Sequence, residues 1–312
     1  MSAANISPDS LATGQRHYDH LVSSIGLKDA PASLQLSALR SMSTTDMLDR
    51  LGVAEHSFML EDEEFFSDYS GQLFDQLTTI PSWVQKVVVG QTKEETVVFA
   101  LKWHTMSADQ LRSQWEGIYS DPSYAQEVFA AYGVGKDSSH SDMVAALVAY
   151  TSDNFFTTTA SRLTTEHLKI PGPGNPKVYS YCFDQPDIIS KRPVWRGSAY
   201  HSVEIPFLFR HPQVAGSDAS PEFRKTSDTF STAVLHLLNG NEPWEDVSIA
   251  KRWMRLDGEK SGIANENDSL GARWAVLANS PERHQKFMLG MMLLGDAMGY
   301  ALTAFSAESL AD

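Results

Sequence analysis

The chain has 312 residues, of which 42% are hydrophobic and 10% are aromatic. This composition supports a large hydrophobic core, and it excludes a disordered, collagen-like or disulfide-rich protein. The 25 Lys and Arg residues against 39 Asp and Glu residues give a formal net charge of −14. Because such a surface repels polyanions, we expect no nucleic acid partner and no membrane partner.

The cysteine content and the N-terminal sequence indicate the cellular compartment of the protein. The single cysteine, Cys182, cannot form an intramolecular disulfide. A secretory signal has a charged leader followed by an apolar stretch. The first five residues do not show this pattern. The longest apolar run, residues 287–295, is about half as long as a membrane span requires. We therefore expect a cytoplasmic protein.

Hydrophobic residues recur with helical spacing in three segments, residues 18–25, 124–132 and 143–150. A further helix is expected at about 281–305, because Ser280 can cap it and Pro281 suits the first helical position. No repeat and no change in composition marks an internal boundary. We therefore expect a single domain over residues 1–312.

Two short segments have the character of strands. Residues 87–89 precede Gly90, and residues 178–183 follow the turn-forming segment 171–176. Both are β-branched or aromatic and are bounded by turn residues. Short apolar strands that alternate with long helices predict an α/β fold, helix-rich, with a mostly parallel sheet covered on both faces.

Two groups of polar residues have an ordinary structural explanation. His17 and His20 lie three residues apart on the first helix, but no carboxylate or cysteine spacing completes a metal-binding set. Residues 139–142 read Ser-His-Ser-Asp, yet neighbours in sequence cannot normally reach the geometry of a catalytic triad, so we expect a solvated turn. No metal, nucleotide or flavin signature is found, and we expect no cofactor.

Two other segments are better candidates for chemistry. Residues 90–96 directly follow a predicted strand, where α/β enzymes carry catalytic loops, and they include Glu94 and Glu95. Residues 196–209 place His201 between a glycine and a stiff apolar run, a suitable mount for a general base. The residues alone also fit ordinary roles, a polar helix start and a structural histidine.

Taken in order, these segments resemble the C-terminal part of the type B carboxylesterases, an α/β-hydrolase family that includes cholinesterases and fungal lipases. The family's Gly-Thr-x-x-Asp-Glu-Gly stretch carries the triad acid, and residues 90–96 match it. Its Gly-x-x-His-x-x-Glu-hydrophobic-x-Phe-x-Phe loop carries the triad base, and residues 197–209 match it. The resemblance implies that Glu95 is the acid and His201 the base, in the chain order that this fold uses.

Further segments extend the resemblance over nearly the whole chain. Leu27 and Ala38, the latter in an expected turn, occupy positions where secreted members have two disulfide-bonded cysteines, and this paired loss fits an intracellular protein. Residues 153–156 resemble the family's Asp-x-x-Phe helix, residues 178–184 the strand after it, and residues 237–244 the Phe-Ala-x-x-Gly-x-Pro stretch. The expected C-terminal helix departs from the family.

The nucleophile of the family is missing from these 312 residues. No Gly-x-Ser-x-Gly elbow and no His-Gly-Gly-Gly-like oxyanion loop occurs, and the sequence begins after the point where the family places its serine. Ser198 and Ser202 flank His201 too closely for in-line proton transfer, and Ser41 and Ser107 lack an elbow around them. Loss of a triad serine costs on the order of a millionfold in turnover, so we expect hardly any ester hydrolysis from this chain alone.

Absence of the early strands also predicts an exposed apolar sheet edge at the strand that ends at Val89. We expect a complementing N-terminal half, self-association through that edge, or aggregation. Three interpretations stay open. The chain is part of a carboxylesterase-like serine hydrolase that acts on a small ester or a secondary metabolite; it is a pseudoenzyme that binds or scaffolds through the family's helical pocket between Lys102 and Leu168; or it is a remnant without a present role.

Overall fold

A computed structural model describes residues 11–51, 83–119, 121–167, 176–246, 252–265, 273, 276 and 277. The chain divides into two compact units: residues 1–5 with 77–292, and residues 6–76 with 293–312. The C-terminal helix expected at about 281–305 lies outside the described residues. The single domain expected over residues 1–312 stays a prediction.

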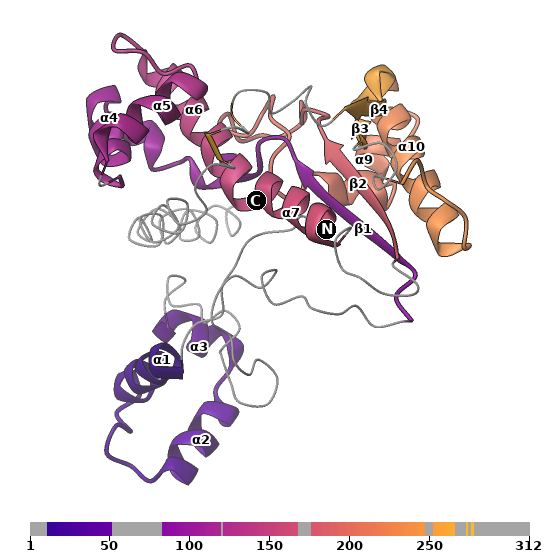
Figure 1. Ribbon diagram of the computed structural model, residues 1–312. Coiled ribbons are helices and arrows are strands. Elements are labelled where there is room, and N and C mark those ends of the chain that lie inside the picture. Colours follow the sequence, from indigo (N-terminus) through magenta and orange to yellow (C-terminus); the bar gives the residue numbers. More distant parts are fainter. Residues whose placement is uncertain are drawn as a thin grey trace. The chain divides into compact units, whose positions relative to one another are not determined.

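Three helices make up the described part of the smaller unit: α1 (Leu11–Ser24), α2 (Ala32–Ser41) and α3 (Thr44–Leu51) (Figure 1). The periodicity at residues 18–25 is confirmed by α1. The turn expected at Ala38 is wrong, because Ala38 lies inside α2. Its neighbours there, Leu39 and Arg40, are strong helix formers, so local propensity explains the difference.

A buried glutamine ties α2 to the connection that follows α1. The Tyr18 hydroxyl donates to Gln35 Oε1 at 2.7 Å. The Gln35 amide donates to the carbonyl oxygens of Leu27 at 2.9 Å and of Lys28 at 3.1 Å. Gln35 is 8% exposed, so water cannot easily replace these partners. The hydrogen bonds thus connect the two helices beside Leu27, one of the positions where the resemblance implies a cysteine.

We expect Gln35→Leu to lower the free energy of unfolding by about 1–3 kcal/mol, because it leaves the Tyr18 hydroxyl and the carbonyl oxygens of Leu27 and Lys28 without their partner. The matched control is Gln15→Leu, which removes an exposed hydrogen bond to Asp19 and should change the free energy by less than about 0.5 kcal/mol. Urea unfolding followed by circular dichroism measures both. Equal transition midpoints for the two variants would contradict the assigned role of Gln35.

A four-stranded sheet lies in the larger unit (Figure 1). Its strands β1, β2 and β3 are parallel to one another, and β4 is antiparallel to β3. The predicted α/β class, the mostly parallel sheet and both predicted strands are confirmed. β1 pairs with β2 along its whole length and is the outermost strand of the described sheet. In sheet order the strands are β1 (Lys86–Thr92), β2 (Lys177–Phe183), β3 (Arg252–Leu256) and β4 (Gly262–Asn265).

Aromatic side chains of β2 build a core with the helices that follow the His201 loop. Tyr181 and Phe183 pack with Phe207, Phe223 and Phe230 in one buried cluster. Phe207 lies on α8 (Glu204–Leu208), and Phe223 and Phe230 lie on α10 (Pro221–Leu238). A buried valine of α9 (Pro212–Ala215) completes the cluster. α7 (Thr158–His167) contacts β1 and β2 and lies beside β1 in Figure 1.

Gly90 of β1 lies opposite Tyr181 of β2 in the parallel register. The Tyr181 ring occupies the space that a side chain at position 90 would need, since an ideal Cβ there would lie 2.1 Å from Tyr181 Cε1. Only glycine lets the ring pack this closely on the neighbouring strand. The glycine of the sequence motif is therefore required by packing.

The helices between β1 and β2 begin where the sequence provides caps. Ser107 and Ser139 each form a capping box with the residue three positions later, which satisfies free amide groups of the first turn. Residues 139–142 are thus the start of α6, and the solvated turn expected there is wrong. The helices expected at residues 124–132 and 143–150 are confirmed. This layer contains α4 (Ala108–Gly117), α5 (Pro122–Ala131), α6 (His140–Ser152) and the π-helical segment η3 (Asp153–Thr157), which leads into α7.

Three short 3₁₀ helices complete the described secondary structure: η1 (Glu95–Phe99), η2 (Trp103–Thr105) and η4 (Gly258–Lys260). η1 directly follows β1 and carries the candidate acid, Glu95. Within the ranges that the structure describes, no helix combines the length and the apolarity that crossing a membrane requires.

Candidate functional site

The side chains of Glu95 and His201 lie in hydrogen-bond contact although they are 106 residues apart in sequence. His201 Nδ1 is 2.6 Å from Glu95 Oε2, and Glu95 Oε1 accepts the backbone N–H of Thr92 at 2.6 Å. The Glu95 side chain is fully buried, whereas that of His201 is 39% exposed. With Nδ1 on the carboxylate, Nε2 is the nitrogen left to exchange a proton with another group.

Glu94 fastens the two loops that carry this pair. Its N–H donates to the carbonyl oxygen of Ala199 at 2.9 Å, and the Ala199 N–H donates to Glu94 Oε2 at 2.8 Å. Burial raises the pKa of Glu94, although the Ala199 N–H favours the ionised carboxylate. The adjacent glutamates therefore differ in role: Glu94 holds the loop backbone, and Glu95 faces His201.

The backbone around His201 adopts uncommon conformations. Gly197 has φ +92°, and Ser202 has φ +69°. Positive φ costs a non-glycine residue energy, and such residues gather at functional sites. On another side, the His201 ring contacts the Phe156 ring, with centroids 5.5 Å apart. The loop thus holds the imidazole between the Glu95 carboxylate and an aromatic ring.

The surroundings change the proton affinity of His201. The hydrogen bond to Glu95 raises the pKa of His201, burial opposes this, and the charges of Glu95 and Glu204 add to the rise. The protonated imidazole is therefore favoured in the folded state. Its contribution to stability is present below the ordinary pKa of 6.5 and is lost as the pH rises through the raised value.

We expect Glu95→Gln to lower the pKa of His201 toward its ordinary value, because the substitution removes the charged acceptor on Nδ1. NMR titration of the imidazole protons measures this pKa. The destabilisation caused by Glu95→Gln should be larger at about pH 5 than at about pH 9, since the charged pair exists only below the raised pKa. An unchanged His201 pKa in this variant would show that the contact does not form in solution.

A cavity of about 440 Å³ lies beside this pair. Glu94 and Ser198, from the two joined loops, line it, whereas Glu95 and His201 are not among its lining residues. Much of its wall is apolar and comes from α6. The cavity is therefore next to the candidate catalytic pair and separate from it.

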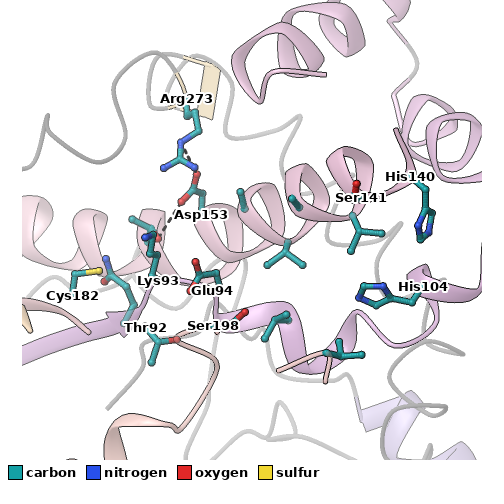
Figure 2. A pocket seen from close by; sticks show the side chains of 18 of the residues that line it. Thr92, Lys93, Glu94, His104, His140, Ser141, Asp153, Cys182, Ser198 and Arg273 are labelled. Atoms are coloured by element: carbon teal, nitrogen blue, oxygen red, sulfur yellow. Dashed lines mark hydrogen bonds and ion pairs between the residues drawn. The ribbon is translucent and has the colours of Figure 1, made fainter. Parts of the chain in front are cut away.

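The two ends of the cavity are polar. Figure 2 shows His104 and His140 at one end and Arg273 with Asp153 at the other. Burial and the neighbouring His140 lower the pKa of His104, and burial raises the pKa of Asp153 to about 6. Arg273 Nε lies 3.4 Å from Asp153 Oδ2. An apolar wall with polar groups at its ends is typical of sites for small organic molecules.

Two further sequence candidates belong to the smaller unit. His17 and His20 lie on α1. Across the described ranges, no group of three His, Cys, Asp or Glu side chains is arranged to hold a metal ion. The cofactor expectation stays a prediction.

The sequence analysis missed the contacts that support the pair. Glu94 binds the backbone of Ala199, and Thr96 is bound to residues at the end of α6. One signal was available: Thr96 stands where the family pattern has glycine. The contact partners themselves are too distant in sequence to be found from local patterns.

Among known proteins, the chain matches a family model over most of its length. No curated protein matches it significantly. A family model described as the carboxylesterase family matches residues 1–273, a range that includes both loops of the candidate pair. The match stops before the expected C-terminal helix, which the sequence analysis placed outside the family pattern. The helix-rich α/β fold with its mostly parallel sheet fits part of an α/β-hydrolase, and the chain belongs to the carboxylesterase family.

Proposed function

We propose that this chain supplies the acid and the base of a serine-dependent carboxylesterase, and that the serine comes from outside these 312 residues. The observation that carries the proposal is the 2.6 Å contact between His201 Nδ1 and Glu95 Oε2. The two residues stand at the positions where the family motifs have the acid and the base. The substrates are carboxylic esters, either small esters or esters of a secondary metabolite.

The mechanism is acyl transfer in two halves. The serine oxygen attacks the ester carbonyl carbon while His201 Nε2 takes the hydroxyl proton, and Glu95 stabilises the resulting imidazolium. His201 then gives this proton to the alcohol oxygen as the ester C–O bond breaks, which leaves an acyl-serine. Water repeats the sequence: it attacks the acyl carbon and loses a proton to His201. His201 returns this proton to the serine oxygen as the acyl–serine C–O bond breaks, which releases the carboxylic acid and restores the serine hydroxyl.

The position of β1 supports a complementing segment. Within the described sheet, β1 has β2 on one side and is outermost on the other, while its residues Val89–Thr92 are buried. An outer strand of this kind, half of it buried, favours the addition of further strands. We propose that a segment corresponding to the missing N-terminal half pairs with β1 and carries the serine elbow. A second copy of this chain bound along β1 is the alternative outcome.

The DNA upstream of the Met1 codon, read for a frame that encodes Gly-x-Ser-x-Gly, provides the test. The encoded segment is co-expressed with this chain, treated with a fluorophosphonate and assayed with p-nitrophenyl acetate and butyrate. We expect the label on the serine of the added segment and hydrolysis that requires both parts. A label on a serine of the 312 residues would show that the chain holds its own nucleophile and would overturn the proposal.

A second candidate is a pseudoenzyme that binds a small molecule in the region between Lys102 and Leu168. The cavity favours it, because His140, Val144 and Val148 of α6 line a space that excludes Glu95 and His201. Saturable binding of a p-nitrophenyl ester without hydrolysis would favour this candidate. The affinity should be unchanged in His201→Ala, because His201 does not line the cavity. The lack of an upstream elbow would agree with it.

We also propose a cytoplasmic location for the protein. Cys182 is a free cysteine, and Leu27 and Ala38 stand where secreted members have paired cysteines. A chain without these paired cysteines needs no oxidising compartment, which fits the reducing cytosol. Subcellular fractionation of the native host, with the protein recovered in the organelle or extracellular fraction, would contradict this.

A further inference from the structure

Three buried hydroxyl groups join the start of η1 to the end of α6. Thr96, Thr151 and Ser152 are 2%, 0% and 1% exposed. The Thr96 hydroxyl lies 2.5 Å from Thr151 Oγ1 and 3.1 Å from Ser152 Oγ, and the Thr96 N–H donates to Ser152 Oγ at 3.1 Å. Thr151 in turn donates to the carbonyl oxygen of Leu147 at 2.7 Å. Each hydroxyl can thus donate one hydrogen bond and accept another.

This cluster holds the backbone immediately after Glu95. On the other side of Glu95, the Thr92 N–H binds the Glu95 carboxylate itself. The acid is therefore held both through its own side chain and through the residue that follows it. A glycine at position 96, as in the family pattern, would lack a hydroxyl and could not make the side-chain bonds.

The same helical segment also contacts the base. α6 ends at Ser152, and η3 continues from Asp153 to Thr157. It includes Phe156, whose ring packs against His201. A π-helical insertion changes which side chains a helix presents on one face, and such insertions are frequent at functional sites. One continuous segment thus contacts both the residue beside the acid and the ring of the base.

We propose that Thr96 is a positioning residue of this site: its hydroxyl, bound to Thr151 and Ser152, holds Glu95 in contact with His201. The catalytic meaning of this inference rests on the proposed esterase function. Its geometric content, the dependence of the Glu95–His201 contact on the Thr96 hydroxyl, can be measured without any hydrolysis.

The pKa of His201 in the full chain reports the contact directly. Thr96→Val keeps the shape of the side chain and removes the hydroxyl, whereas Thr96→Ser keeps the hydroxyl. We expect the valine variant to shift the His201 pKa downward in the direction of Glu95→Gln, and the serine variant to retain the wild-type value. Glu204, whose charge also raises this pKa, is unchanged in every variant. The His201 signal is assigned by its loss in His201→Gln.

Thr226→Val is the matched control. Thr226 is also fully buried, and its hydroxyl donates to Gln185 Oε1 at 2.8 Å and accepts the Gly258 N–H at 2.7 Å. Its loss should lower the melting temperature and leave the His201 pKa unchanged. In an enzyme completed by its serine, Thr96→Val should reduce kcat by about tenfold to a hundredfold, because small displacements of catalytic groups are costly.

If Thr96→Val does not fold, Ser152→Ala removes the cluster from the α6 side and should shift the His201 pKa in the same direction. A wild-type His201 pKa in folded Thr96→Val, or in Ser152→Ala when the valine variant is unfolded, would overturn the positioning role and leave the esterase proposal standing. A downward shift of the His201 pKa in Thr96→Val would support the positioning role. If turnover of the completed enzyme then did not depend on His201, the proposed function would be refuted.

Discussion

In the enzyme completed by its serine-bearing segment, His201→Ala should lower kcat by about a hundred thousandfold to a millionfold. The alanine variant has no group that takes the serine proton and returns it to the leaving alcohol, and triad members act as one unit. Steady-state hydrolysis of p-nitrophenyl butyrate measures the loss. A decrease of less than about tenfold would remove His201 from the mechanism.

Glu95→Gln in the same enzyme should cost about ten thousandfold, since the amide no longer stabilises the imidazolium that forms during attack. The adjacent Glu94→Gln is the control. Its amide oxygen can still accept the Ala199 N–H, the bond that Glu94 makes in the structure, so turnover should stay within about tenfold. Similar losses in the two variants would contradict the separate roles of the two glutamates.

The pH dependence of the completed enzyme follows from the direction of the His201 pKa. The base must be neutral to accept a proton. kcat/KM should therefore rise with pH through the pKa of His201 in the free enzyme, which Glu95 raises above 6.5. In Thr96→Val this rise should move to lower pH, together with the pKa measured by NMR. If the pH at which kcat/KM rises were the same in wild type, Glu95→Gln and Thr96→Val, a group other than His201 would be titrating.

Gly90→Ala should lower the free energy of unfolding by about 3 kcal/mol, because the new methyl group would overlap the Tyr181 ring. The ring cannot move aside easily: Tyr181 is 1% exposed and packs against Phe230, with centroids 5.0 Å apart. The clash, at 2.1 Å from Cβ to Tyr181 Cε1, lies between two paired strands. Denaturant unfolding measures the loss.

Gly117→Ala is the matched control for this substitution. Gly117 is the last residue of α4, and no atom lies within 4 Å of an ideal Cβ there. Helix propensity alone should make this variant neutral or more stable by up to about 1 kcal/mol. If Gly90→Ala were as stable as Gly117→Ala, the packing of Tyr181 on β1 would be wrong.

Local signals in the sequence were sufficient for the elements that carry the site. Apolar residues at helical spacing predicted α5 and α6, although the cap at Ser139 was interpreted as a turn, and the β-branched run before Gly90 is β1. These features act between residues a few positions apart, where steric preference and capping operate. The family motifs added the order of acid and base. Where two local signals competed, as at Ala38, helix propensity prevailed over the expected turn.

The sequence by itself therefore determined the α/β class, the positions of β1, β2, α1, α5 and α6, and the two loops that hold Glu95 and His201. Only the tertiary structure decided that the two side chains meet, that Glu94 binds Ala199 instead, and that Thr96 is bound to the end of α6. These contacts join residues more than fifty positions apart. The packing of the sheet against its helices brings these residues together. A local sequence pattern cannot predict contacts between residues so far apart in the chain.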